Sequence, residues 1–284
     1  RVRTRTEVSV EDTSGKTYDL PSGPIKGISS IEEATILLYG EMKIGKTSLC
    51  SEFKNPLFFL FEPGGKGLEI SSVNCETWSE FKKYLDKALE SDFGTLVIDT
   101  VDRAYDKCYK YMLRKLGVEH PNELEWGEGW KKINEEFQDT MDRLVYSSKG
   151  VLFVSHVETK EFQTRLGRRY NKLIPSMPKG ARSYLTGIVD VTMFYGYLGT
   201  DRYITLRGSD ELDAGTRLKK FFRTPEGSRV HSIPMFDPDD PDFDEADSYN
   251  KLVDAFYNKQ DDVCDINKAP TLSEIPALRE KKKR

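Results

Sequence analysis

The chain has 284 residues, a formal net charge of −4 and 32% charged residues. This composition is typical of an ordinary globular protein, and it excludes a membrane-spanning protein because no window approaches the roughly 18 uninterrupted apolar residues that a membrane helix needs. The small net charge gives no global attraction to nucleic acid, so any such binding depends on a local basic surface. We therefore expect a globular protein that resides in the cytoplasm.

The first segment, residues 1–33, is polar and contains turn residues at Ser14-Gly15 and at Pro21 to Pro24. We expect it to form an extended arm that leads into a main domain at residues 34–236. The chain begins with Arg1 rather than Met, which we expect of a sequence that starts inside a longer reading frame.

Short apolar runs alternate with helical patterns through the main domain. Buried strands of a parallel sheet are predicted at Ala34–Tyr39, Pro56–Phe61, Thr95–Ile98 and Val151–Val154. Helices are predicted at Thr47–Phe53, from Thr77, where Thr77 and Glu80 match a capping box, and at Trp130–Tyr146. Val189–Leu198 and Tyr203–Leu206 predict an antiparallel edge hairpin. The predicted fold is α/β, with a mostly parallel central sheet, helices on both faces and that hairpin at the edge.

The last segment, residues 237–284, differs in composition from the rest. Seven of the eleven residues from Asp237 to Asp247 are acidic, a tract expected to stay solvated. A short helix is predicted at Tyr249–Asn258, followed by a basic tail at Arg279–Arg284. The four cysteines, Cys50, Cys75, Cys108 and Cys264, have no C-x-x-C spacing, so we expect reduced thiols rather than a zinc site or disulfides.

The strongest motif lies between the first predicted strand and the first predicted helix. There, GEMKIGKT fits G-x-x-x-x-G-K-[ST], a loop whose backbone N–H groups close around phosphate oxygens. We expect Lys46 to reach the β and γ phosphates of ATP and the Thr47 hydroxyl to bind Mg²⁺. The predicted nucleotide-binding residues are Gly40, Glu41, Met42, Lys43, Ile44, Gly45, Lys46, Thr47 and Ser48.

Polar residues end three further predicted strands, and the carboxyl ends of parallel strands meet at one sheet edge. Asp99 follows Thr95–Ile98 and is expected to be the second metal-side ligand. Glu62 follows Pro56–Phe61 and is the candidate base for an attacking water; the alternative is a surface acid. His156, after the fourth strand, is either a sensor of the γ-phosphate or a structural histidine.

This order of motifs resembles the RecA-like P-loop ATPase core, and most of all its short, phage-encoded members, which act as core-only recombinases or single-strand annealing proteins. The resemblance covers roughly residues 34–229. It implies an Mg²⁺-dependent ATPase in which Glu62 activates water and His156 couples the nucleotide to DNA-binding loops. The family usually has glutamine at the position of His156, so the histidine is a departure.

The resemblance also places the DNA-binding loops at Glu158–Tyr184, a segment with a local excess of basic residues. Gly167 and Gly180 would give it flexibility, and Tyr170 and Tyr184 would stack on bases of single-stranded DNA. The alternative is a solvated lid over the nucleotide. The predicted DNA-binding residues are Lys160, Arg165, Arg168, Arg169, Lys172, Lys179 and Arg182.

RecA-like subunits complete each other's active sites with a cation from the neighbour. Arg217 is the first choice for that cation, with Lys219 and Lys220 as alternatives; the other interpretation is a basic strand surface. The resemblance thus implies a homo-oligomer, a ring or a filament, that binds single-stranded DNA beside a single-strand-binding protein in the cytoplasm of a phage host.

Two other classes of function share the phosphate loop. A P-loop kinase would use Arg165 to Arg169 as a lid, although Glu62 favours water as the acceptor. A replication accessory protein, such as a helicase loader, would change its interactions according to the bound nucleotide and would not bind DNA directly. The N-K-x-D match at Asn258–Asp261 follows a helix rather than a core strand, so we do not interpret it as a guanine-reading motif.

Overall fold

The computed structural model describes residues 10–11, 17–18, 23–24, 26–65, 67–199, 201–235 and 245–259. Its strands are β1 Val10–Glu11, β2 Thr17–Tyr18, β3 Thr35–Gly40, β4 Pro56–Leu60, β5 Ser71–Asn74, β6 Thr95–Asp99, β7 Gly150–Gln163, β8 Arg169–Pro175, β9 Val191–Leu198, β10 Asp201–Thr205, β11 Gly215–Thr216 and β12 Ser232–Met235. Its α-helices are α1 Lys46–Ser51, α2 Trp78–Leu89, α3 Val101–Leu116, α4 Glu128–Val145, α5 Lys179–Ile188 and α6 Glu245–Phe256. Short 3₁₀ turns lie at Ile31–Glu33, Pro121–Glu123 and Glu125–Gly127.

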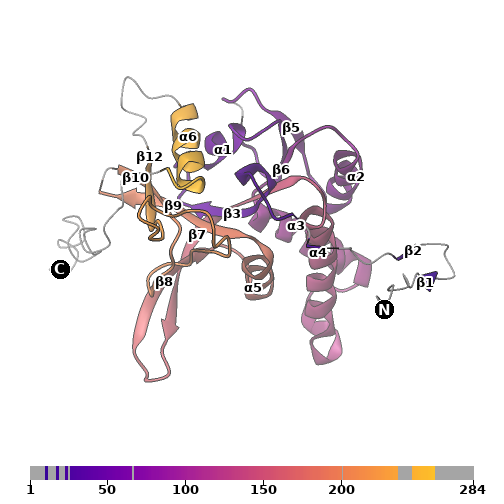
Figure 1. The fold of residues 1–284 in the computed structure, drawn as a ribbon. Helices are drawn as coiled ribbons and strands as arrows, with labels where there is room; N and C mark the ends of the chain where they lie inside the picture. The colour runs from indigo at the N-terminus through magenta and orange to yellow at the C-terminus, as the bar shows by residue number, and fades with distance from the viewer. Residues whose placement is uncertain are drawn as a thin grey trace, which may run out of the picture.

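A single large sheet organises the molecule (Figure 1). Its strand order is β12-β10-β9-β3-β7-β6-β4-β5, with β11 beside β9 and β8 beside β7. The strands from β9 to β5 in this order run parallel, and β10 runs antiparallel to β9. β12 pairs antiparallel with β10, so it runs in the same direction as β9. The predicted α/β fold, a RecA-like P-loop core with a mostly parallel sheet, is therefore confirmed.

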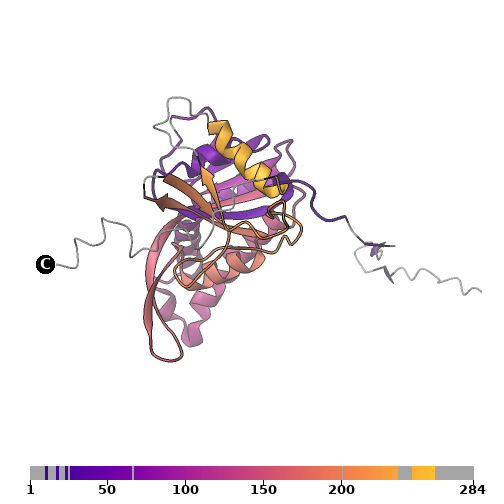
Figure 2. The ribbon, with the colours of Figure 1, turned by 60° about the vertical axis from the view of Figure 1, so that its left-hand side comes forward.

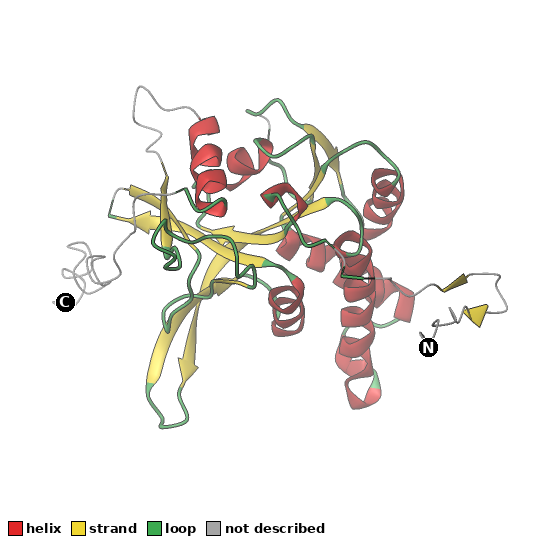
Figure 3. Cartoon of the chain, in the orientation of Figure 1, coloured by secondary structure: helices red, strands yellow, loops and turns green. Residues whose placement is uncertain are grey.

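Helices cover both faces of the sheet, as the secondary-structure colours show (Figure 3). Strand residues alternate between the faces: Leu37 packs with α2, α3, α4 and α5, whereas Ile36 and Leu38 pack with α1 and α6. Because both faces are buried, the central strands are continuous apolar runs, which is what made them recognisable in the sequence.

Three of the predicted elements have different bounds or a different place in the sheet. β7 continues to Gln163 instead of ending near Val154, and pairs with β8 in a long hairpin that projects from the body of the molecule (Figures 1 and 2). The edge hairpin is formed by β9 and β10, but β9 is an inner strand beside β3, and β12 is the edge. α6 begins earlier than predicted, and its Phe256 is fully buried in the core.

The predicted helix start at Thr77 is confirmed, with both hydrogen bonds of the capping box present.

Of the cysteines, Cys50, Cys75 and Cys108 are buried free thiols, and Cys264 lies outside the described residues. The basic tail also lies outside them, as do residues 237–244 of the acidic tract. None of the helices within the described ranges combines the length and apolarity that crossing a membrane requires.

The helices of one face are joined through a half-buried carboxylate. Glu136 of α4 accepts hydrogen bonds from the Trp78 indole (3.0 Å) and the Lys82 ammonium (2.6 Å), both on α2, and its other oxygen lies 3.8 Å from Lys115 on α3. Burial alone would raise the pKa of Glu136, but the bonds from Lys82 and Trp78 outweigh it and lower that pKa. The carboxylate therefore stabilises the packing of three helices.

Replacing Glu136 with glutamine should lower the free energy of unfolding by about 1–3 kcal/mol at neutral pH, because a charged hydrogen-bond acceptor is lost. Urea unfolding measures this, with Glu135→Gln as control, since Glu135 makes only an exposed 3.7 Å pair with Lys131 and should cost about 0.5 kcal/mol or less.

The pKa of Glu136 is lower in the folded state than in the unfolded state. The contribution of its charge to the free energy of unfolding is therefore complete above the ordinary glutamate pKa of about 4.3, and it is lost as the pH falls through the folded-state pKa. Wild type and Glu136→Gln should therefore converge in acid. A difference that stays constant down to strong acid would show that the charge is not the cause.

Candidate active site

The phosphate loop follows β3 directly and requires glycine at two positions for different reasons. Gly45 has φ +106°, in the region that favours glycine. At Gly40, an added Cβ would lie 2.0 Å from the carbonyl oxygen of Tyr195 on β9, so no side chain fits there. The second glycine shapes the loop, whereas the first allows β3 and β9 to pack.

Lys46 is the charged centre of the loop. Its side chain is buried, and its Nζ donates to the carbonyl oxygens of Gly40 (2.9 Å) and Glu41 (2.6 Å). Burial lowers the pKa of the Lys46 ammonium, and the carboxylates of Asp99 and Asp102 oppose that shift. The nearby carboxylates therefore do not fully offset the effect of burial on the positive charge of Lys46, and the ammonium is well suited to bind an incoming anion.

Thr47 and Asp99 lie in direct contact. The Thr47 hydroxyl donates to Asp99 Oδ2 at 2.8 Å, joining the first residues of α1 to the end of β6. Asp99 is 7% exposed, and burial raises its pKa while the hydrogen bond from Thr47 opposes that rise. A hydroxyl and a carboxylate at this spacing are the oxygen donors that Mg²⁺ prefers, so the two residues fit a magnesium ion.

Glu62 and His156 are also brought together, although they are far apart in sequence. His156 Nε2 and Glu62 Oε1 share a hydrogen bond of 3.1 Å, and Glu62 Oε2 lies 3.5 Å from Nε of Arg103. The register explains the meeting: His156 lies beside Gly40 in neighbouring strands, and Glu62 follows β4, which pairs with β6 at Asp99. Both residues therefore lie at the edge that holds the phosphate loop.

These groups line one cavity of about 760 Å³, which also contains a face of α3 that the sequence did not reveal. Asp102, Arg103 and Asp106 lie on that face. Burial raises the pKa of Asp102, and His156 opposes the rise. Among the described residues, Asp102 Oδ1 and His156 Nδ1 are buried without a hydrogen-bond partner. Asp106 follows Asp102 by four residues and Arg103 by three, a spacing that places all three residues on one face of a helix. This pattern, just after Asp99, is the signal that could have identified them.

The predicted DNA-binding residues divide into two groups. Lys160, Arg165, Arg168 and Arg169 are exposed on the β7–β8 hairpin and Lys179 is exposed at the start of α5. Two others are engaged inside the chain: Lys172 pairs with Asp213 at 2.6 Å, and Arg182 is buried, 3.2 Å from Glu158 and bonded to the Met177 carbonyl. The structure thus corrects the exposed strip by removing Arg182 from it, because its charge is neutralised at the base of the hairpin.

The aromatic residues of this segment divide in the same way. Tyr170 stacks on Phe162 across the hairpin, with ring centroids 5.9 Å apart. Tyr184 instead donates from α5 to Asp142 on α4 at 2.5 Å, so its role is to join two helices. Gly167 forms the hairpin tip at φ +84°, whereas Gly180 lies in the first turn of α5. Beside Gly167, Leu166 is 97% exposed.

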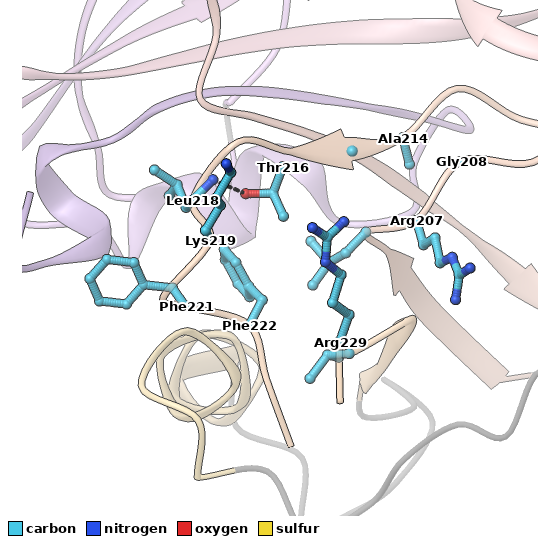
Figure 4. Close-up of a pocket in the computed structure, with 12 residues that line it drawn as sticks. Arg207, Gly208, Ala214, Thr216, Leu218, Lys219, Phe221, Phe222 and Arg229 are labelled. Atoms are coloured by element: carbon cyan, nitrogen blue, oxygen red, sulfur yellow. Dashed lines mark hydrogen bonds between the residues drawn. The ribbon is translucent and has the colours of Figure 1, made fainter. Parts of the chain in front are cut away.

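The three candidates for the shared cation lie at the opposite edge of the sheet from the phosphate loop. β11, which precedes Arg217, pairs with the start of β9, and the Arg217 guanidinium donates to the carbonyl of Gly187 at the end of α5. Lys219 lines a separate cavity of about 190 Å³ with Arg207 and Arg229 (Figure 4). In that view the Arg229 side chain extends between Phe222 and Arg207. None of the three lines the cavity that holds Lys46.

The N-K-x-D match is partly described. Asn258 accepts a hydrogen bond from the Arg223 amide (2.8 Å) and donates to the Lys220 carbonyl (2.9 Å), so it fastens the end of α6. Gln260 and Asp261 lie outside the described residues. Asn258 does not line the cavity of the phosphate loop.

Comparison with known proteins gives a family and two similar proteins. An AAA domain model matches residues 32–218. A SPbeta prophage-derived uncharacterized protein of Bacillus subtilis (strain 168), YorG, is 26% identical over 182 residues, which are 60% of this chain and 52% of that protein. The chain thus spans about half the length of that relative. A KaiC-like protein of Pyrococcus horikoshii, PH0186, has a crystal structure that is 13% identical, with a TM-score of 0.41 over 72% of this chain and 86% of that one.

The AAA domain model covers well over half of the chain, and the phosphate loop, β6 with Asp99 and β7 all lie inside the matched range. The sheet also has the strand order and helix layers of a P-loop core. The chain therefore belongs to the AAA domain family.

Proposed function

We propose that the chain is an Mg²⁺-dependent ATPase that binds single-stranded DNA on the β7–β8 hairpin and acts in phage-type recombination, annealing or repair. The observation that carries this proposal is the continuity of β7. One strand holds His156 beside Glu62 at the nucleotide cavity and runs on, without an intervening loop, into the exposed basic hairpin.

The hydrolysis step uses residues that already lie at one edge of the sheet. Lys46 turns from its loop carbonyls to the β and γ phosphates of ATP. Glu62 accepts a proton from a water whose oxygen bonds to the γ-phosphorus; the bond between that phosphorus and the bridging oxygen of ADP breaks, and phosphate leaves. Glu62 is suited to this because it lines the same cavity as Lys46.

Thr47 and Asp99 would hold the magnesium ion, which supplies positive charge to the phosphates. No cluster of three or more His, Cys, Asp and Glu residues fit to hold a metal occurs in the described part of the chain. The ion therefore depends on Thr47, Asp99 and the nucleotide itself, so magnesium and ATP should bind together.

Two further contacts join the hairpin to the nucleotide site. The Ser176 amide, just after β8, donates to the His156 carbonyl at 2.8 Å, and Ser176 itself lines the cavity. The hydroxyl of Tyr39, which precedes Gly40, lies 2.5 Å from the Asp213 carbonyl and 3.2 Å from the Leu173 carbonyl of β8, so it contacts the base of the hairpin as well as the loop after it. A displacement of the phosphate loop or of His156 would therefore be transmitted to both hairpin strands.

The hairpin has the chemistry of a surface for a single-stranded backbone. Residues 157–175 contain five basic and two acidic residues. Arg165 and Arg168 are exposed at the tip, next to the exposed Leu166 and the stacked pair Phe162 and Tyr170. Exposed cations beside aromatic rings suit phosphates and bases that are not paired in a duplex.

The biological setting is inferred from the relative rather than from the site. The YorG protein of Bacillus subtilis is prophage-derived, which supports a phage origin and a bacterial cytoplasm for this chain as well. A homo-oligomer, as a ring or filament, and contact with a single-strand-binding protein are part of the same proposal.

The two rival functions receive less support. A kinase lid would place arginines over the cavity, but Arg165, Arg168 and Arg169 are not among the residues that line it. A replication accessory protein would need no exposed basic hairpin next to its nucleotide sensor. Binding of single-stranded DNA is the property that separates these functions.

The Glu62→Gln variant should bind ATP with unchanged affinity and hydrolyse it about 10²–10⁴-fold more slowly, because the amide cannot accept the proton of the attacking water. Fluorescent-nucleotide binding and phosphate release measure the two properties. Glu69→Gln is the control, since Glu69 is exposed in the same β4–β5 connection and lies outside the cavity. Equal turnover in wild type and Glu62→Gln would mean that another group is the base.

Replacing Arg165, Arg168 and Arg169 together with glutamine should weaken binding of single-stranded DNA and reduce the slope of log affinity against log salt by about 2, because three phosphate contacts are lost. Fluorescence anisotropy of a labelled oligonucleotide across a salt series measures both. The control removes three exposed lysines of α2 and α4, Lys83, Lys87 and Lys131. If both triple variants lose the same affinity, the hairpin is not the binding surface.

A further inference from the structure

We propose that Arg103 supplies, within the same chain, the cation that acts on the transferred phosphate, and that it restrains Glu62 until nucleotide arrives. This inference rests on the proposed roles of Lys46 and Glu62. It assigns to a residue of the cavity the part that the family resemblance gave to a neighbouring subunit.

Arg103 lies at the reacting end of the cavity. It is the third residue of α3, which begins two residues after Asp99, and it lines the cavity together with Lys46 and Thr47. It is the one arginine among the described residues of this lining. A planar guanidinium in this position can bind two phosphate oxygens at once.

The guanidinium is held loosely in this structure. A cation in the first turn of a helix is opposed by the helix dipole, so Arg103 depends on nearby carboxylates. Its Nε lies 3.5 Å from Glu62 and its Nη1 3.4 Å from Asp106, both long for a charged pair. The side chain is 55% exposed, and no contact of its Nη2 group is seen among the described residues. It is therefore free to reorient.

Because Arg103 is paired with Glu62, reorientation of Arg103 also changes which groups Glu62 can contact. One oxygen of Glu62 faces Arg103 and the other is bonded to His156, so both oxygens already have a partner, and the guanidinium competes with an attacking water for Glu62. A γ-phosphate competes for the guanidinium with more charge and more acceptor oxygens than one carboxylate. When Arg103 turns to the phosphate, Glu62 is released to accept a proton.

The rival cation is poorly placed within one chain. Arg217 lies at the other edge of the sheet, where its amide donates to the Asp190 carbonyl at 3.0 Å and its guanidinium donates to Gly187. It reaches a phosphate only if a second chain presents its own site there. Arg103 needs no second chain, so the two assignments predict opposite behaviour when variants are mixed.

The test compares Arg103→Ala with Arg114→Ala, which removes an exposed arginine from the other end of α3. Arg103→Ala should bind ATP normally, lose turnover about 10³-fold or more, and fail to form a tight complex with ADP and aluminium fluoride, a mimic of the transferred phosphoryl group. Arg103→Lys should recover only part of the turnover, because an ammonium cannot bind two oxygens in one plane.

Mixing Lys46→Ala with Arg103→Ala should restore no hydrolysis, since each site lacks a residue of its own chain. Recovery on mixing would overturn the assignment, as would turnover in Arg103→Ala within a few-fold of wild type. Turnover faster than wild type would leave Arg103 as a restraint on Glu62 alone and would overturn its phosphate role. If Lys46→Ala alone keeps full turnover, the site itself is wrong, and the proposed function fails rather than this inference.

Discussion

The register between β3 and β7 is the constraint on which the site depends. It places Gly40, the first residue of the phosphate loop, beside His156, while β6 on the other side of β7 places Asp99 beside Val154. Because these strands are parallel and buried on both faces, a shift by one residue would turn every side chain to the wrong face. The packing of the two strand faces against their helices, which holds the register, therefore also sets the distances between Lys46, Asp99 and His156.

Much of this site was predictable from sequence because its parts follow recognisable strands. The phosphate loop, Asp99, Glu62 and His156 each end an apolar run, and parallel strands end at one edge. Arg103 was missed because its signal, a charged helix face after Asp99, is visible only when α3 is recognised as a helix. Arg182 was misinterpreted for a different reason: composition counts its charge, but cannot show that Glu158 and the Met177 carbonyl neutralise it.

The β7–β8 hairpin is a larger feature that the sequence pattern did not predict. The apolar run that predicts β7 ends at Val154, yet the strand continues to Gln163 because β8 returns alongside it with seven paired positions. A polar strand of this kind is stabilised by its partner and not by the core, so periodicity alone cannot find it. The proposed coupling depends on that continuity, since a stiff strand would transmit a displacement that a flexible loop would absorb.

In the proposed function, nucleotide chemistry at Glu62 and DNA contact at the hairpin are coupled through β7. The most direct test is the rate of ATP hydrolysis by the wild-type chain with and without single-stranded DNA at low salt. Turnover should rise clearly when single-stranded DNA is added, and raising the salt concentration should reverse the rise. Turnover that is identical with and without DNA would contradict it.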